Sequence, residues 1–261
     1  SATVRICSFG SEQAPRTAVL MGDSHVGQWF PAVHRALDDA GWSGLQHRGA
    51  RLLQDAGITN PAWQTGVIWS GLLADLAVLS CGGVANGIYP TDAAAQVHYL
   101  CEDSRTTVLF VEDDEQLDKA LEVRGQLPLL RKVVVFDMEG LRSLNDPDVL
   151  SLANLRDLGR AWNTQHPEAL MQRVNACRPE DLAILVYTSG TTGKPKGAMH
   201  THGALTYTVR GYNTLISRSE ADETMCFLPL CHIAERMGGE YFSLYTGARL
   251  NFVENPDTVP E

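Results

Sequence analysis

The chain has 261 residues, 44% of them hydrophobic and 20% charged, which is enough for one large core or two modest ones and excludes wholesale disorder. Its formal charge is −10 at pH 7 without a Lys/Arg cluster, so nucleic acids and anionic membranes are poor candidate partners. The six cysteines never form a C-x-x-C pair, so neither a disulfide framework nor a zinc site is expected. No charged-then-apolar leader and no run of about 18 apolar residues occurs, and we expect a cytoplasmic protein without a transmembrane segment.

The N-terminal segment, residues 1–43, predicts a single strand–turn–helix unit. Residues 17–23 (TAVLMGD) form an apolar run of strand length that leads into a Gly-Asp-Ser turn. An amphipathic helix follows and ends near Gly41. Between residues 44 and 71 the periodicity weakens, and we expect a junction of uncertain structure there.

Residues 72–261 alternate between helices and apolar strands. Helices are expected at residues 72–80, 91–101 (capped by Thr91), 113–124, 150–177 (interrupted at Pro167), 203–215 and 232–244. Strands are expected at residues 84–89, 107–111, 132–136, 182–188, 198–201, 224–228 and 249–253. Continuous apolar strands between helices are typical of a largely parallel sheet with helices on both faces, so we predict an α/β fold. No helix covers the last strand, and we expect the natural domain to continue.

The loop at residues 187–197 (YTSGTTGKPKG) carries the most chemical information. Four hydroxyl side chains and three glycines fall within ten residues, directly after an apolar strand. Glycines allow a close approach of backbone N–H groups to a ligand, and Lys194 and Lys196 add point charges suited to phosphate oxygens. The glycine spacing differs from a Walker A loop, and no G-x-G-x-x-G motif occurs. The loop therefore favours a polyphosphate anion over a dinucleotide.

This loop is similar to the signature of the adenylate-forming superfamily of acyl-CoA ligases, luciferases and adenylation domains. Two further stretches, residues 82–104 (GGVANGIYPTDAAAQVHYLCEDS) and 228–254 (LPLCHIAERMGGEYFSLYTGARLNFVE), resemble its long-chain fatty-acyl-CoA ligases. The resemblance covers about residues 72–261. It implies part of an adenylate-forming N-terminal domain, which would be incomplete in this chain.

The resemblance implies a two-step reaction with ATP, Mg²⁺ and coenzyme A. A fatty acid would attack the α-phosphate of ATP to give an acyl-adenylate, and coenzyme A would then displace AMP. The residues implied to hold the phosphates are Thr188, Ser189, Gly190, Thr191, Thr192, Gly193, Lys194 and Lys196. Thr188 is the expected Mg²⁺ ligand, and Lys196 is also expected to act in catalysis. His232 matches the family's histidine near the acyl-adenylate pocket, although a histidine that only packs at the start of a helix explains it equally well.

Two later motifs of the family do not occur in this sequence. These are the Tyr-Gly-x-Thr-Glu turn, whose carboxylate binds Mg²⁺, and the Thr-Gly-Asp that holds the ribose. The resemblance therefore implies that this chain by itself turns over poorly or not at all.

The N-terminal segment resembles a different family. The run RTAVLMGDSH at residues 16–25 is similar to the first block of SGNH-type hydrolase and acyltransferase domains, in which the serine after Gly-Asp is the nucleophile. That would make Ser24 the nucleophile of a serine esterase or acyltransferase. The other blocks of that family, Gly-x-Asn-Asp and Asp-x-x-His, do not occur, so we favour a capped turn. A non-catalytic fusion remnant is a third interpretation of the whole chain.

Overall fold

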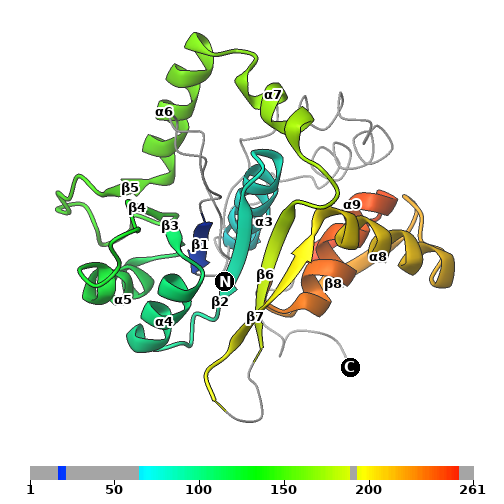
Figure 1. The fold of residues 1–261 in the computed structure, drawn as a ribbon, viewed down its shortest axis with the longest axis horizontal. Helices are drawn as coiled ribbons and strands as arrows, with labels where there is room; N and C mark the ends of the chain where they lie inside the picture. Colours follow the sequence, from blue (N-terminus) through cyan, green and yellow to red (C-terminus); the bar gives the residue numbers. More distant parts are fainter. Residues whose placement is uncertain (1–16, 22–64, 189–192, 253–261) are drawn as a thin grey trace.

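The computed structural model describes residues 17–21, 65–188 and 193–252 (Figure 1). The strands are β1 (Thr17–Met21), β2 (Val84–Ile88), β3 (Thr106–Val111), β4 (Lys132–Val135), β5 (Val149–Ser151), β6 (Leu182–Thr188), β7 (Lys196–Thr201), β8 (Glu223–Cys226) and β9 (Arg249–Phe252). The helices are α3 (Thr65–Ser80), α4 (Ala94–Asp103), α5 (Asp114–Arg124), α6 (Leu152–Gln165), α7 (Ala169–Ala176), α8 (His202–Leu215), the π-helical segment η1 (Glu235–Tyr241) and α9 (Phe242–Thr246).

The described strands form two sheets. The larger has seven strands in the order β5-β4-β3-β1-β2-β6-β7, and β8 pairs with β9 in a separate parallel sheet. Within the larger sheet every pair is parallel except β6–β7, which forms an antiparallel hairpin. The predicted α/β fold with a largely parallel sheet is therefore confirmed.

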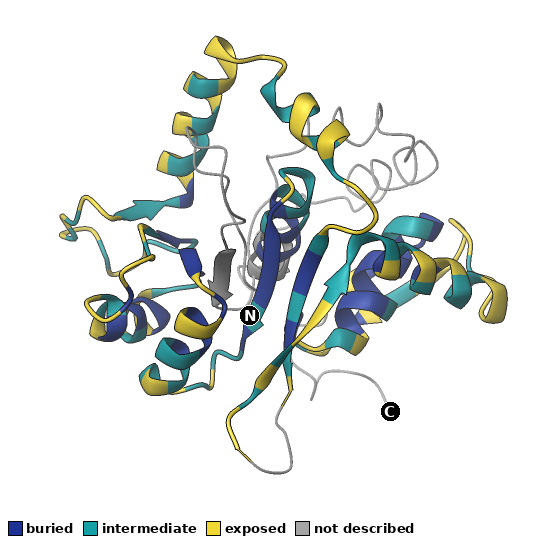
Figure 2. Ribbon diagram, in the orientation of Figure 1, coloured by how far each residue is buried: buried dark blue, intermediate teal, exposed yellow. Residues whose placement is uncertain are grey.

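The core lies on both faces of the larger sheet, as the buried strands in Figure 2 show. All six residues of β3 are buried, and successive side chains point to opposite faces. Val108 and Phe110 join one cluster with residues of α3 and α8, whereas Leu109 and Val111 join another with residues of α4 and α5. A strand covered on both faces needs apolar residues at every position, which is why the sequence reads as uninterrupted apolar runs.

The start of α4 differs from the prediction. Thr91 does not cap this helix, which begins at Ala94 after Ala93, a residue whose side chain makes no capping hydrogen bond. Instead, Thr91 lies in a tight turn in which the N–H of Asp92 donates to the carbonyl oxygen of Tyr89. Pro90 occupies the second position of that turn, where its fixed φ is favoured. The turn therefore uses the residues from which the sequence predicted a helix start.

The C-terminal helical region also differs in detail. The predicted helix at residues 232–244 is interrupted by η1, a wider π-helical stretch that continues into α9. The sequence did not predict the edge strand β5, because three residues are too few to show an alternating apolar pattern.

The strand predicted in the N-terminal segment lies inside the large sheet. Residues 17–21 pair in parallel with β2 on one side and β3 on the other. The helix expected up to Gly41 lies outside the described residues, as does the junction up to residue 64. Residues 65–71, expected to belong to the junction, are the first turns of α3.

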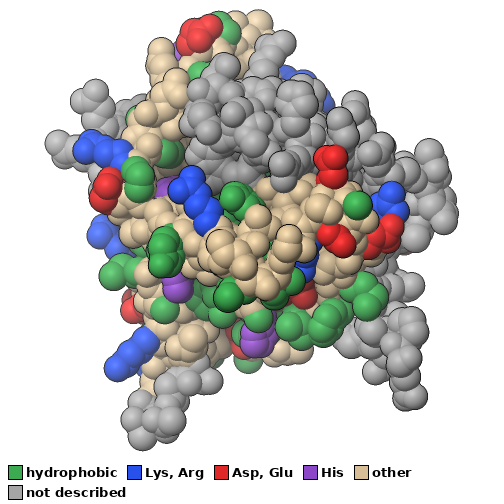
Figure 3. All heavy atoms as spheres, turned by 90° about the vertical axis from the view of Figure 1, so that its right-hand side faces the viewer, with side chains coloured by type: hydrophobic (Ala, Val, Ile, Leu, Met, Phe, Trp, Pro, Cys, Tyr) green, Lys and Arg blue, Asp and Glu red, His purple; other side chains and the backbone are tan. Residues whose placement is uncertain are grey.

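Large apolar side chains remain exposed on part of the described surface. Figure 3 shows hydrophobic side chains on the face that lies to the right in Figure 1. Tyr207 and Leu215 of α8 are 80% and 83% exposed, and Met199 of β7 is 73% exposed. Among the described helices, none has the length and apolar character to cross a membrane.

Candidate functional site

The β6–β7 hairpin carries the glycine-rich loop. Thr188 at the end of β6 pairs with Lys196 at the start of β7, so this pair closes the loop. Four predicted phosphate-binding residues lie outside the described residues: Ser189, Gly190, Thr191 and Thr192. The side chains of Thr188, Lys194 and Lys196 are exposed, so their hydroxyl and ammonium groups are accessible to a ligand.

Gly193 has a backbone conformation that explains why glycine is used there. Its φ angle is +106°, in the region that side chains with a Cβ rarely adopt, and no atom within 4 Å would block an added Cβ. The backbone, and not the available space, therefore favours glycine at this position.

Helix α4 contacts the exit of the loop. The hydroxyl of Tyr99 donates a hydrogen bond of 2.7 Å to the carbonyl oxygen of Pro195. The ammonium nitrogen of Lys194 lies 4.5 Å from the centre of the Tyr99 ring, within the range of a cation–π interaction. One side chain of α4 thus contacts two successive residues of the loop.

The same helix contacts the strand that enters the loop. Tyr187 precedes Thr188, and its hydroxyl donates a hydrogen bond of 2.6 Å to the Asp103 carboxylate. Burial and this hydrogen bond raise the pKa of Tyr187 well above its ordinary value, so the hydroxyl stays protonated and remains a donor. Across the hairpin, a Cβ at Gly197 would lie 3.1 Å from the Tyr187 ring. Gly197 therefore leaves the space that this ring occupies.

His232 lies near the residue that follows β2. Its ring meets the ring of Tyr89 edge-on, with centroids 5.9 Å apart and an interplanar angle of 83°. Burial, with a smaller effect of Cys231, raises the pKa of Tyr89 to about 12. The last registered pair between β2 and β6 is Asn86–Leu185, and Tyr89 and Thr188 follow it at equal spacing.

Because β2 and β6 are parallel, His232 and the loop lie at the same carboxyl edge of the sheet. Within the described residues, no hydrogen bond or ion pair joins His232 to Thr188 or Lys196. The structure therefore brings His232, Thr188 and Lys196 to one edge without connecting them directly.

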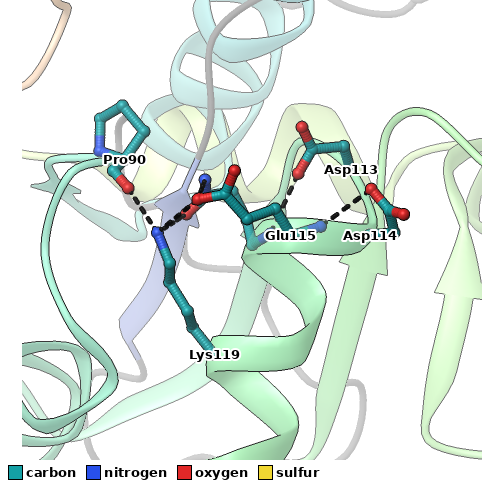
Figure 4. A network of polar contacts seen from close by, with 6 residues as sticks. Pro90, Asp113, Asp114, Glu115 and Lys119 are labelled. Carbon is teal, nitrogen blue, oxygen red and sulfur yellow. Dashed lines mark hydrogen bonds and ion pairs between the residues drawn. The ribbon is translucent and has the colours of Figure 1, made fainter.

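The turn between β2 and α4 is tied to α5 (Figure 4). The ammonium group of Lys119 donates to the carbonyl oxygen of Pro90 at 2.7 Å and forms an ion pair of 3.0 Å with Glu115. At the start of α5, Asp113 caps the helix by accepting from the N–H of Gln116 at 3.0 Å. This network fixes the backbone directly after Tyr89, the aromatic neighbour of His232.

A buried polar cluster anchors the helix that follows His232. Arg236 of η1 forms an ion pair with Asp75 of α3, and the Tyr241 hydroxyl donates to the same carboxylate at 2.5 Å. Glu240 is fully buried beside them, and burial, together with the nearby carboxylate of Asp75, raises its pKa. The sequence did not predict this cluster, because Asp75 is 161 positions from Arg236 and no local pattern links it to the residues of η1.

Clustered metal ligands are absent from the part of the chain that the structure describes. There, no group of three or more His, Cys, Asp or Glu side chains is arranged to hold a metal ion. The Thr188 hydroxyl is the ligand that the sequence predicts, and it is exposed at the mouth of the hairpin.

Comparison with known protein families identifies the chain. The profile of the AMP-binding enzyme family matches residues 47–261. The chain belongs to the AMP-binding enzyme family. A second profile, the SGNH domain (fused to AT3 domains), matches residues 1–58 of this AMP-binding chain, in agreement with the resemblance of its N-terminal segment.

Curated relatives of this AMP-binding chain are long-chain-fatty-acid–CoA ligases. ACSBG2 of Xenopus laevis is 31% identical over 192 residues, which cover 72% of this chain and 25% of the relative. FadD15 of Mycobacterium bovis is 34% identical over 168 residues, covering 63% of this chain and 26% of the relative. The chain thus spans about a quarter of the length of the curated relatives it matches.

Solved structures of AMP-binding enzymes share the fold. ATP-bound MatB from Rhodopseudomonas palustris matches with a TM-score of 0.53 and 20% identity over 86% of this chain and 39% of that one. The anthranilate CoA ligase AuaEII in complex with anthranoyl-AMP matches with a TM-score of 0.53 and 21% identity over 85% and 39%. The adenylate-forming fold expected from the sequence is therefore confirmed.

Proposed function

We propose that this chain forms the phosphate-binding part of an ATP-dependent ligase that activates long-chain fatty acids to acyl-CoA. The observation that carries the proposal is the β6–β7 hairpin, which presents a loop rich in glycine, hydroxyl and lysine residues at the carboxyl edge of a parallel sheet. Ligands of open α/β sheets bind at this edge. Membership of the AMP-binding family and the names of the relatives support the reaction class.

The donors of the loop suit the β- and γ-phosphates of ATP. Backbone N–H groups near Gly193 and the Thr188 hydroxyl offer neutral donors, and Lys196 adds a positive charge beside Thr188. Mg²⁺ bound with the nucleotide would neutralise part of the phosphate charge, with the Thr188 hydroxyl as its protein ligand. These groups act by positioning and by charge neutralisation, which are the main catalytic contributions in phosphoryl chemistry.

In the proposed reaction, a fatty carboxylate attacks the α-phosphate and releases pyrophosphate, and the thiol of coenzyme A then displaces AMP from the acyl-adenylate. His232 would line the acyl-adenylate side of the site. Its edge-on contact with Tyr89 orients the ring, and the network around Lys119 holds the backbone next to Tyr89 in place. We propose that these 261 residues alone bind the nucleotide phosphates and turn over poorly, because the family's Mg²⁺ and ribose motifs do not occur among them.

We also propose that residues 17–21 belong to the same folding unit as residues 65–252. Strand β1 comes from the segment that matches the SGNH domain, yet both of its neighbours, β2 and β3, belong to the segment that matches the AMP-binding family. The esterase or acyltransferase hypothesis centred on Ser24 stays a prediction, because Ser24 lies outside the described residues.

Calorimetric titration with Mg-ATP tests the phosphate-binding function. We expect saturable binding by the wild-type chain and a loss of affinity of about tenfold or more in Lys196→Ala, because a hydrogen bond to a charged group contributes about 1.5–3 kcal/mol. The matched control is Lys132→Ala. Lys132 begins β4, so it lies at the amino ends of the parallel strands, opposite the carboxyl edge, and it pairs with Asp148. Absence of saturable binding by a folded wild-type chain would refute the proposal, and so would equal affinity of the two variants.

A further inference from the structure

We propose that Tyr99 of α4 is a positioning residue that clamps the exit of the phosphate-binding loop. The inference rests on the proposed function of that loop, but the contacts themselves are independent of it. The Tyr99 hydroxyl donates to the Pro195 carbonyl oxygen at 2.7 Å, and its ring lies below the ammonium group of Lys194 at 4.5 Å. A hydrogen bond and a cation–π contact therefore both involve the Tyr99 side chain, which is 96 residues from Pro195 in the sequence.

The helix that carries Tyr99 is firmly held. Val97, Leu100 and Cys101 of α4 are buried, and the Tyr99 ring packs against the same cluster. This cluster includes Leu109 and Val111 of β3, Val133 and Val135 of β4, and the apolar face of α5. A contact made from this helix is consequently made from a rigid part of the molecule.

One face of α4 contacts the hairpin both before and after the glycine-rich part of the loop. Tyr99 and Asp103 are four residues apart on the helix, so their side chains lie on the same face. Asp103 accepts the hydrogen bond from Tyr187 on β6, the strand that enters the loop, whereas Tyr99 holds Pro195, the loop residue directly before β7. The loop is therefore fixed at its entry and its exit by two side chains of a single helix.

The clamp changes the role of Lys194. The sequence predicts that Lys194 binds phosphate, but its ammonium group lies over the Tyr99 ring. Lys196, which pairs with Thr188, has no such aromatic neighbour within the described residues. We therefore assign Lys194 to the clamp and Lys196 to the phosphates.

A clamp of this kind reduces the conformational entropy cost of binding a ligand to the loop. A glycine-rich segment has many accessible conformations, and ordering them opposes binding. Anchoring Lys194 and Pro195 beforehand restricts those conformations without adding a contact to the nucleotide. Loss of Tyr99 should then weaken Mg-ATP binding even though its side chain is not assigned to the phosphates.

The first test needs no nucleotide. Amide hydrogen exchange is compared for the peptide covering residues 187–199 in the wild-type chain, Tyr99→Phe and Tyr99→Leu. We expect faster exchange in Tyr99→Phe, which keeps the ring but loses the hydroxyl, and still faster exchange in Tyr99→Leu. The matched control is Tyr207→Phe, because Tyr207 is 80% exposed on α8. Unchanged exchange in both Tyr99 variants would overturn the clamp.

The second test separates the two contacts by their coupling to Lys194. Removing one net hydrogen bond in Tyr99→Phe should weaken Mg-ATP affinity by about fivefold. Adding Lys194→Ala should weaken binding further in the Tyr99→Phe background, where the ring remains, but not in the Tyr99→Leu background. A merely structural role of Tyr99 would produce no such dependence on the ring, so an equal effect of Lys194→Ala in both backgrounds would overturn the assignment of Lys194.

The outcomes also distinguish the clamp from the proposed function. Altered exchange together with no Mg-ATP binding by the folded wild-type chain would refute the phosphate-binding function and leave the clamp as a structural device. Normal Mg-ATP binding with unchanged exchange and affinity in the Tyr99 variants would refute the clamp and leave the function standing.

Discussion

Arg236 on η1 and Asp75 on α3 form an ion pair although 161 residues separate them, and each side chain is 1% exposed. The Tyr241 hydroxyl donates to the same carboxylate, so Asp75 has more than one partner. The pair connects the helix that leads into β2 with the helix that follows His232. It therefore supports the part of the carboxyl edge where His232 meets Tyr89.

Breaking this pair should strongly destabilise the chain. Asp75→Leu leaves the Arg236 guanidinium buried without its counter-charge, and we expect the free energy of unfolding to fall by about 3–5 kcal/mol. Asp148→Ala, which breaks a largely exposed pair with Lys132, should lower it by at most about 1 kcal/mol. Urea denaturation measures both values. The double variant Asp75→Leu/Arg236→Met should recover much of the loss, and equal effects of the two single variants would contradict the buried pair.

The buried Glu240 should make stability depend on pH. It lies beside Asp75, Arg236, Glu235 and Tyr241, and burial is the main cause that raises its pKa above the ordinary 4.5. Above that pH the unfolded state releases the proton while the folded state retains it. The free energy of unfolding therefore falls as the pH rises, by at most about 1.4 kcal/mol per pH unit for one proton.

Glu240→Gln removes this titration. Relative to the wild-type chain, the variant should become progressively more stable as the pH rises above the ordinary pKa of 4.5, as measured by urea denaturation at a series of pH values. Glu139→Gln is the matched control, because Glu139 is exposed. Parallel pH profiles of Glu240→Gln and the wild-type chain would show that Glu240 does not retain a proton on folding.

Gly197→Ala should weaken the hairpin. The added Cβ would lie 3.1 Å from the Tyr187 ring, which is held in place by its hydrogen bond to Asp103. We expect a loss of about 1–2 kcal/mol in thermal unfolding and weaker Mg-ATP binding. Gly211→Ala in α8 should have the opposite sign, a gain of about 0.5–1 kcal/mol, because no atom lies within 4 Å of its added Cβ. The same sign for both variants would contradict the crowding at Gly197.

Leu20→Pro tests whether β1 belongs to the large sheet. Leu20 pairs with Gly87 of β2 and Phe110 of β3, and proline would remove a backbone donor from the middle of this strand. We expect a loss of about 3 kcal/mol in urea denaturation. Leu20→Ile retains the donor and the preference for strands, and should change stability little. An unchanged unfolding midpoint in Leu20→Pro would place residues 17–21 outside the folding unit.

Several elements could be predicted because their signal is local. Residues 182–188 form β6 as expected, and Asp113 caps α5 at the position where a helix start was predicted. The start of α4 was wrong because a Pro90 turn competes for the residues that would cap it. The loop could be recognised because its glycines, hydroxyls and lysines are contiguous. Its clamp could not, since Tyr99 is 96 residues from Pro195 and carries no local signal.

The sequence by itself determined the α/β class, the order of most helices and strands, and the family resemblance of both segments, because apolar periodicity and contiguous motifs are properties of neighbouring residues. Only the tertiary structure decided that β1 lies between β2 and β3, that Asp75 faces Arg236, and that α4 contacts both Tyr187 on β6 and Pro195 at the loop exit. Such contacts join residues far apart in the chain. They depend on which faces pack together in the complete core, and no short stretch of sequence contains that information.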